Sequence, residues 1–158
     1  MISVKSLLNL LRKNKIDFYT VVPDSVLKEF SFSIKNKKHI IAVNEGAAVS
    51  IGIGNYLSTG KIPCVYMQNS GLSNAINPLI SISDKKVYSI PLVLIIGWRG
   101  APNTNDEPQH NVKGKITKQI LKLLNIKYTV VNSDSDLKKF NQQIKYAKKN
   151  LSTVACLI

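Results

Sequence analysis

The stretch "HIIAVNEGAAVSIGIGNYLSTGKIPCVYM", residues 39–67, contains a strand, a helix and a second strand in succession. Its two ends, "HIIAV" and "IPCVYM", are short apolar runs typical of buried strands. Between them the sequence predicts a helix that begins near Glu45 and ends near Gly60. A strand–helix–strand unit with apolar strands is typical of α/β proteins, in which helices cover a parallel sheet.

The rest of the chain repeats this alternation on both sides of the opening stretch. Asp24 or Ser25 is the predicted cap of the second helix, and Pro78 interrupts the fourth. Further strands are predicted at 17–22, 90–98, 127–131 and 152–158, and further helices at 1–15, 24–34, 71–82, 114–125 and 133–149. We therefore predict the α/β class: an open, mainly parallel six-stranded sheet with helices on both faces, in one domain over residues 1–158.

The composition is that of a basic protein with a formal net charge of +13. Among the 22 basic residues only Arg12 and Arg99 are arginines, and the lysines are scattered over predicted helix faces and turns. Nucleic-acid sites favour arginine forks and stacked aromatic rings, so we expect a lysine-rich solvated surface and no nucleic-acid partner. The positive field is suited to attracting a small anionic substrate.

Hydropathy and cysteine usage favour a cytoplasmic protein. No apolar run approaches the roughly 20 residues needed to cross a bilayer, so no membrane interaction is predicted. The first 15 residues lack a small-residue cleavage site and carry apolar residues at helical spacing, which favours an amphipathic helix over a signal peptide. Cys64 and Cys156 lie in strand-like runs, so we expect buried thiols in a reducing compartment.

Polar residues follow four of the predicted strands, at the positions where ligands bind in sheets of this kind. They are Asp24 and Ser25, Asn44 and Glu45, residues 68–71 ("QNSG"), and residues 97–100 ("GWRG") with "NDEPQH" (105–110) shortly after. We expect these four loops to line one edge of the sheet. Glu45 is one of only three glutamates and has no basic residue within five positions. From the residues alone, it is either a helix-start acid favoured by the helix dipole or a functional carboxylate.

Common catalytic motifs do not account for these loops. "GIG" (52–54) lacks the third glycine of a dinucleotide-binding turn, so its glycines are predicted to allow close packing. "QNSGLSN" lacks the glycine spacing of a nucleophile elbow, and Gly60-Lys61 lacks the neighbours of a phosphate-binding loop. The two histidines, His39 and His110, lie in different segments, so no metal site of the chain's own is predicted. His39, at the start of a strand, is expected to be structural.

Four segments taken together resemble one known family. They are "VVPDSVLKEF", "NEGAAVSIGIGNYLSTGKIPCVYMQNSGLSNAINPL", "YSIPLVLIIGWRG" and "DEPQH". They resemble the pyrimidine-binding (PYR) domain of the thiamine-diphosphate-dependent 2-oxoacid decarboxylases, from about residue 2 to residue 158. Within that family the resemblance is strongest to the phosphonopyruvate decarboxylase branch, followed by the alpha subunit of sulfopyruvate decarboxylase.

The resemblance implies catalytic roles for three residues. Glu45 takes the place of the glutamate that hydrogen-bonds N1′ of the cofactor's aminopyrimidine, so that the cofactor's own imino nitrogen can act as a base. Asp24 takes the place of an aspartate that takes part in proton transfer, with a simple helix cap as the open alternative. His110 lies where related enzymes have a His-His pair, although this chain has Gln109-His110, and an exposed loop histidine is its alternative.

The resemblance also implies binding residues. Asn69, Ser70 and Gly71 match the turn that packs against thiamine diphosphate. Arg99 and Ser25 are the candidate substrate-binding residues, with Arg99 as a clamp for a distal anion such as a phosphonate. An ordinary ion pair is the alternative for Arg99, and Trp98 is expected to be a packing residue.

Half of a complete active site is expected to come from elsewhere. Enzymes of this family hold Mg²⁺ and the diphosphate with a Gly-Asp-Gly motif in a second (PP) domain, and this chain contains no Gly-Asp-Gly. The Mg²⁺ ligands are therefore expected on a PP-domain subunit or on the C-terminal half of a longer chain. The resemblance also implies an oligomer in which PYR domains associate with one another.

The implied reaction converts 3-phosphonopyruvate to phosphonoacetaldehyde and CO₂. The alternatives are a sulfopyruvate decarboxylase alpha subunit and a non-catalytic PYR-like binding or regulatory module, against which the presence of Glu45 counts.

Overall fold

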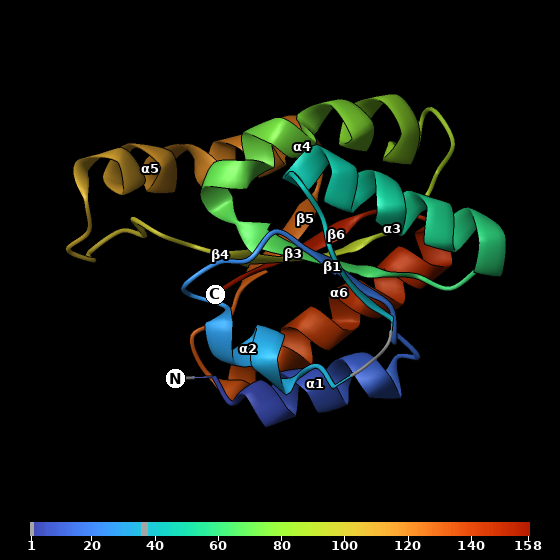
Figure 1. Cartoon of the computed structure of the whole chain (residues 1–158), viewed down its shortest axis with the longest axis horizontal. Coiled ribbons are helices and arrows are strands. Elements are labelled where there is room, and N and C mark those ends of the chain that lie inside the picture. The colour runs from blue at the N-terminus through green and yellow to red at the C-terminus, as the bar shows by residue number, and fades with distance from the viewer. Residues whose placement is uncertain (1, 36–37) are drawn as a thin grey trace.

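The computed structural model describes residues 2–35 and 38–158, which form a sheet between two layers of helices (Figure 1). The sheet has six strands in the order β2-β1-β3-β4-β6-β5, and every neighbouring pair is parallel. The strands are β1 (Tyr19–Val21), β2 (His39–Ile41), β3 (Cys64–Gln68), β4 (Val93–Gly97), β5 (Lys127–Val130) and β6 (Val154–Leu157). The predicted α/β class and six-stranded parallel sheet are confirmed.

Helices cover both faces of the sheet (Figure 1). One face carries α1 (Val4–Lys13), α2 (Lys28–Ser33) and α6 (Leu137–Asn150), and the other carries α3 (Glu45–Thr59), α4 (Leu72–Pro78) and α5 (Pro108–Leu123). Two short turns flank α4: η1 (Asn69–Gly71) precedes it, and η2 (Leu79–Ser83), a π-helical turn, follows it after Pro78. A third short turn, η3 (Asp134–Asp136), precedes α6. No helix of the described ranges is long and apolar enough to cross a bilayer.

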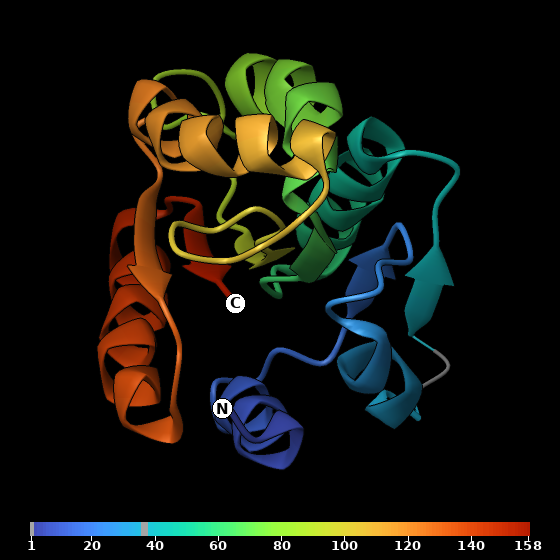
Figure 2. The ribbon, with the colours of Figure 1, turned by 90° about the vertical axis from the view of Figure 1, so that its left-hand side faces the viewer.

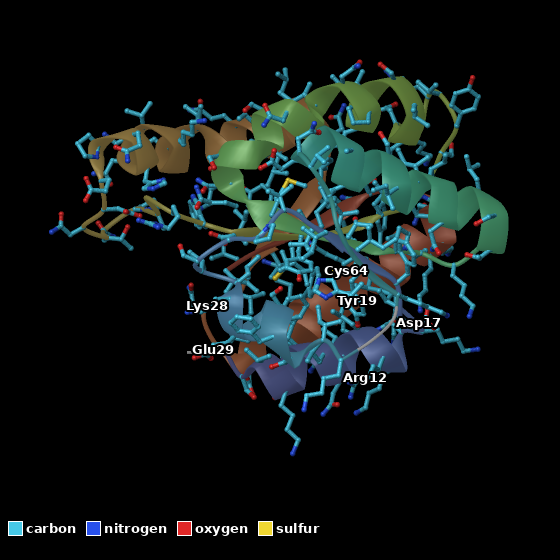
Figure 3. The ribbon with its side chains drawn as sticks, viewed as in Figure 1. Arg12, Asp17, Tyr19, Lys28, Glu29 and Cys64 are labelled. Atoms are coloured by element: carbon cyan, nitrogen blue, oxygen red, sulfur yellow. The ribbon has the colours of Figure 1, made fainter. Side chains whose placement is uncertain are left out.

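The sheet separates two apolar cores, because successive side chains of a strand point to opposite faces. Tyr19 and Cys64, paired in the parallel register of β1 and β3, lie in the core beneath α1, α2 and α6. Figure 3 shows these two side chains inside the molecule, with Arg12, Lys28 and Glu29 on the helices around them. β4 and β6 are buried along their whole length, as expected for central strands of a parallel sheet.

α3 begins and ends where the sequence predicts. The side chain of Asn44 caps the helix by accepting a hydrogen bond from the N–H of Ala47 at 2.8 Å. Gly60 ends it in the left-handed conformation, with φ of 68°. Gly52 lies against β3, where a Cβ atom would be 2.9 Å from a methyl group of Val65. Close packing is therefore confirmed for Gly52, whereas a Cβ on Gly54 would meet open space.

The start of α5 differs from the prediction. The helix begins at Pro108, six residues before the predicted start at residue 114. Proline suits the first helical position, because the N–H group that it lacks would have no partner there. His110 therefore lies in the first turn of a helix and not in a loop.

The start of α2 also differs. The helix begins at Lys28, and the residue before it, Leu27, provides no side-chain cap. Asp24 instead accepts a hydrogen bond from the N–H of Leu27 at 3.3 Å, so its carboxylate stabilises the turn that precedes the helix. The prediction that Asp24 or Ser25 is the N-cap residue of this helix is wrong.

His39 and the two cysteines have the structural positions that the sequence predicts. Nε2 of His39 is 2.6 Å from the hydroxyl group of Tyr66, which donates to Oγ of Ser31 at 2.8 Å. Burial lowers the pKa of His39, so the folded chain favours the neutral ring. Cys64 and Cys156 are free and buried, and burial raises the pKa of both thiols, which keeps them protonated and unreactive.

Candidate active site

The four loops meet at the edge of the sheet where the strands end, as predicted. Nη1 of Arg99, after β4, donates to the hydroxyl of Ser25, after β1, at 3.2 Å. The backbone of Arg99 is bonded to the side chain of Asn69, after β3. Gly71, in the same turn as Asn69, lies against the side chain of Glu45 at the start of α3. Figure 2 looks onto this edge, which the loop leading into α5 crosses.

Glu45 is the first residue of α3, where the helix dipole favours a negative charge. Its side chain is half-buried and forms no ion pair with another residue of the described ranges. Oε2 accepts a hydrogen bond from Nδ2 of Asn74 at 2.8 Å, and the carboxyl group lies directly over the α-carbon of Gly71. A methyl group at position 71 would overlap Oε1. Glycine at this position therefore leaves the space that the carboxylate occupies.

Asp24 also lies over a glycine. A methyl group on Gly97, the last residue of β4, would overlap Oδ2 of Asp24. Oδ1 is buried and has no hydrogen-bond partner within residues 2–35 and 38–158. Burial raises the pKa of Asp24, with the backbone hydrogen bonds of Val26 and Leu27 and the charge of Arg99 acting in the opposite direction. Such a carboxyl group is suited to holding a proton closer to neutral pH than an exposed aspartate.

Arg99 forms a two-pronged ion pair with Asp106. Nε and Nη2 donate to the two carboxylate oxygens at 2.7 and 2.5 Å, so only Nη1 is left for Ser25. The hydrogen bond from Arg99 holds the pKa of Asp106 well below its usual range. Asp106 also accepts from the N–H groups of Gly100 and Glu107, at 2.9 Å each. The sequence analysis gave Asp106 no role, although it lies only seven residues after one of the two arginines.

The side chain of Asn69 is used inside the chain. Asn69 is 3% exposed; Nδ2 donates to the carbonyl of Arg99 and to Oγ1 of Thr117, both at 2.9 Å, and Oδ1 accepts from the N–H of Arg99 at 3.2 Å. Its amide therefore fixes the loop after β4 against α5. Ser70 accepts a hydrogen bond from the side chain of Gln68 at 2.7 Å. Gly71, the third residue assigned to this turn, lies against the side chain of Glu45.

His110 is placed mainly by its backbone. Its carbonyl group lies against Gly100, so close that a Cβ atom on that glycine would overlap it. Nδ1 is buried and has no partner among the described residues, and no hydrogen bond within those ranges joins His110 to Glu45 or Asp24. Nearby, Nε1 of Trp98 donates to the carbonyl of Gly114 at 3.0 Å, and the partly buried ring packs against the apolar core on this face of the sheet, as the sequence predicts.

The loop after β4 packs closely against α5 at Gly114, and this contact gives a prediction for Gly114→Ala. A Cβ atom on Gly114 would overlap the carbonyl of Gly100, whose φ of 65° is itself left-handed. Because backbone atoms cannot turn aside, the variant should lose about 1–3 kcal/mol of unfolding free energy, measured by urea denaturation. Gly54→Ala, in open space on α3, is the control and should be neutral or stabilising by up to about 1 kcal/mol. Equal stability of the two variants would contradict the close contact.

The residues at this edge fit one part of a cofactor. Oε1 of Glu45 accepts no hydrogen bond from any residue in the described ranges, which suits a ligand that brings a donor, such as a protonated ring nitrogen. Within residues 2–35 and 38–158, no group of three or more His, Cys, Asp or Glu side chains could hold a metal ion.

The surface at this edge of the sheet has an open hollow beside the loop that leads into α5. It has a volume of about 250 Å³ and is lined by Arg99 and residues 105–108. A more enclosed cavity of about 190 Å³ lies at the opposite edge, beside Ser83 and Thr153, and includes none of the predicted site residues. Arg99, one of the predicted site residues, borders the hollow at this edge.

Comparison with protein families identifies the type of domain. Residues 3–123 match the thiamine pyrophosphate enzymes, in the part described as the N-terminal TPP binding domain. The matched range includes all four loops and every predicted site residue, from Asp24 to His110.

Curated relatives and solved structures agree with this match. Phosphonopyruvate decarboxylase from Streptomyces viridochromogenes is 36% identical over 99 residues, which are 63% of this chain and 24% of the relative. The sulfopyruvate decarboxylase subunit alpha of Methanocaldococcus jannaschii is 41% identical over 95 residues, which are 58% of this chain and 54% of that subunit. Benzoylformate decarboxylase from Polynucleobacter necessarius has the same fold, with a TM-score of 0.75 at 20% identity over 99% of this chain and 30% of that chain. The matched region is thus about a quarter of the first relative and about half of the second.

Proposed function

The chain belongs to the thiamine pyrophosphate enzymes and carries their N-terminal TPP-binding domain, and from this premise we propose that it is the pyrimidine-binding half of a 2-oxoacid decarboxylase. Glu45 carries the proposal. It is a half-buried carboxylate at the start of a helix, without an ion pair in the described part of the chain and without a hydrogen bond to Oε1 from a described residue. The pyrimidine ring of the cofactor needs such an acceptor to share a proton with its N1′ atom.

The proposed chemistry assigns proton handling to three side chains. Thiamine diphosphate, when bound, would supply the nucleophilic carbon that adds to the keto group and the positively charged ring that delocalises the electron pair left by departing CO₂. Glu45 would hold the pyrimidine ring through Oε1 and share a proton with its ring nitrogen. Asp24, whose pKa is raised by burial, holds a proton for the product-forming steps. His110, whose Nδ1 lacks a partner in the described ranges, is the second candidate for that proton.

We propose 3-phosphonopyruvate as the substrate, with phosphonoacetaldehyde and CO₂ as the products. The relative from S. viridochromogenes supports this choice. So do the two donors at the same edge, Nη1 of Arg99 and the hydroxyl of Ser25, which suit a distal anion. The net charge of +13 further favours the approach of an anionic substrate.

Sulfopyruvate is the second candidate substrate, because it is also a three-carbon 2-oxoacid with a distal anion. The relative from M. jannaschii supports it: that protein is a separate alpha subunit, and the match covers 54% of it. A non-catalytic binding module is less favoured, because the chain retains Glu45 in an accessible position.

We further propose that a second domain or subunit holds the diphosphate and Mg²⁺. Mg²⁺ prefers oxygen ligands, among them carboxylates and phosphates, and the described residues include no group of three or more His, Cys, Asp or Glu side chains that could hold a metal ion. Next to Glu45, Ile41 and Val43 are 68% and 92% exposed. Apolar side chains at the rim of a site are suited to burial under a partner.

Arg99→Ala tests the proposed substrate. In the complete enzyme it should raise KM for phosphonopyruvate by about tenfold or more, and KM for pyruvate much less, because pyruvate lacks the distal anion. Steady-state kinetics with both substrates measures the difference. An equal effect on both would place Arg99 in the scaffold or at the shared carboxylate.

The ion pair of Arg99 requires a second variant as a control. Arg99→Ala leaves the carboxylate of Asp106 without its partner, and that charge repels an anion on its own. Arg99→Ala combined with Asp106→Ala removes the repulsion. Persistence of the higher KM for phosphonopyruvate in this double variant supports a direct role of Arg99, whereas full recovery contradicts it.

A further inference from the structure

Asn74, on α4, donates the one hydrogen bond that Glu45 receives on its carboxyl group from the described residues. The bond joins Nδ2 of Asn74 to Oε2 of Glu45 at 2.8 Å. In this contact the amide nitrogen is the donor and the carboxyl oxygen is the acceptor. The sequence analysis assigned no role to Asn74.

Two glycines bring α3 and α4 close enough for this contact. Gly46, the residue after Glu45, lies where a Cβ atom would be 2.9 Å from the carbonyl oxygen of Asn74. Gly71, just before α4, lies under Oε1 of Glu45. The two oxygens of Glu45 are therefore not equivalent. Oε2 accepts a hydrogen bond from Asn74, whereas Oε1 lies over the backbone of Gly71, which has no side chain.

We infer that Asn74 is a positioning residue, which holds Oε2 of Glu45 so that Oε1 is the oxygen presented to the ring nitrogen of the cofactor. The chemical meaning of this inference rests on the proposed function, but its geometry does not. A carboxyl group carries its proton on one oxygen, and a donor held at the other oxygen decides which one that is. Without the donor the group can rotate, and a smaller fraction of molecules presents the productive oxygen.

Carboxyl NMR signals of the 158-residue chain test the geometry without cofactor or partner. Labelling glutamate with ¹³C gives three carboxyl signals, from Glu29, Glu45 and Glu107, and Glu45→Gln identifies one of them. Asn74→Ala should move the Glu45 signal and leave the other two in place. Asn74 is exposed, so the melting temperature should change by no more than about 2 °C.

Asn77→Ala is the matched control on the same helix. Asn77 is also exposed, and its Oδ1 accepts from Ser81 at 2.9 Å. This variant should leave all three carboxyl signals in place. A Glu45 signal that stays in place in Asn74→Ala, or that moves equally in Asn77→Ala, would overturn the inferred contact.

Turnover of the complete enzyme tests the chemical part. Asn74→Ala should lower kcat and the rate of proton exchange at C2 of the cofactor by about tenfold, with KM for the substrate within about twofold of wild type. Asn74→Asp, which replaces the donor by a like charge, should lower both rates further. An unchanged kcat in Asn74→Ala, with the Glu45 signal moved, would overturn the positioning role. Wild-type turnover in Glu45→Gln would instead refute the proposed function and leave the NMR result standing.

Discussion

Glu45→Gln should slow turnover of the complete enzyme by about 10²-fold or more, the scale of a lost acid–base group. Glutamine keeps the size of the side chain over Gly71 but cannot share a proton with the pyrimidine ring. Proton exchange at C2 of the cofactor, followed by NMR, should slow by a similar factor. Binding of thiamine diphosphate should change little, because the charged end of the cofactor supplies most of its affinity.

Glu29→Gln is the control for this experiment. Glu29 is an exposed glutamate in the first turn of α2, outside the four loops. Its replacement should leave turnover and C2 exchange unchanged. Turnover of Glu45→Gln equal to that of wild type would remove Glu45 from the catalytic machinery and leave it as a helix-start acid.

The second large effect concerns the isolated chain, which should neither hold thiamine diphosphate tightly nor release CO₂ from any 2-oxoacid. The diphosphate is the most highly charged part of the cofactor, and its usual ligands are Mg²⁺ and backbone donors. The described residues include no group of three or more His, Cys, Asp or Glu side chains that could hold a metal ion, and exposed lysines are a weak substitute because salt screens them. Calorimetry with thiamine diphosphate and Mg²⁺ should therefore give binding weaker than micromolar.

A partner that carries Gly-Asp-Gly should restore both binding and turnover. The control is the Glu45→Gln chain with the same partner, which should regain cofactor binding without wild-type turnover. Micromolar binding by the chain alone, or CO₂ release without a partner, would contradict the division of the active site between two parts.

The strand–helix–strand unit shows why much of the fold is predictable from this sequence. The strands at its ends are apolar, Asn44 supplies a cap, and Gly60 supplies the left-handed residue that ends the helix, so three local signals agree. The same loops could be assigned to one edge, because parallel strands all end on the same side of their sheet. Prediction succeeded here because short-range preferences and the overall topology point to the same structure.

The start of α5 and the partners of Arg99 and Glu45 were not predicted from the sequence. The first depends on a local signal, and the other two depend on contacts between distant segments. Pro108 is such a signal, since proline at a first helical position marks the start of α5. Asp106 and Asn74 are different: each is polar and sits in a loop or on a helix face, where many polar residues have no role. Only the fold brings Asp106 to Arg99, and Asn74 to Glu45 across a separation of 29 residues.

β6 is the last strand in the chain but lies between β4 and β5 in the sheet. During synthesis on the ribosome, β1 to β4 can pair soon after they emerge, whereas β5 has no neighbour until Val154–Leu157 leave the exit tunnel. In that interval Val93–Gly97, apolar along its length, keeps one row of N–H and C=O groups unpaired, which is a template for pairing with another nascent chain. The speed at which α6 and β6 are translated should therefore influence how much of the chain aggregates before it folds.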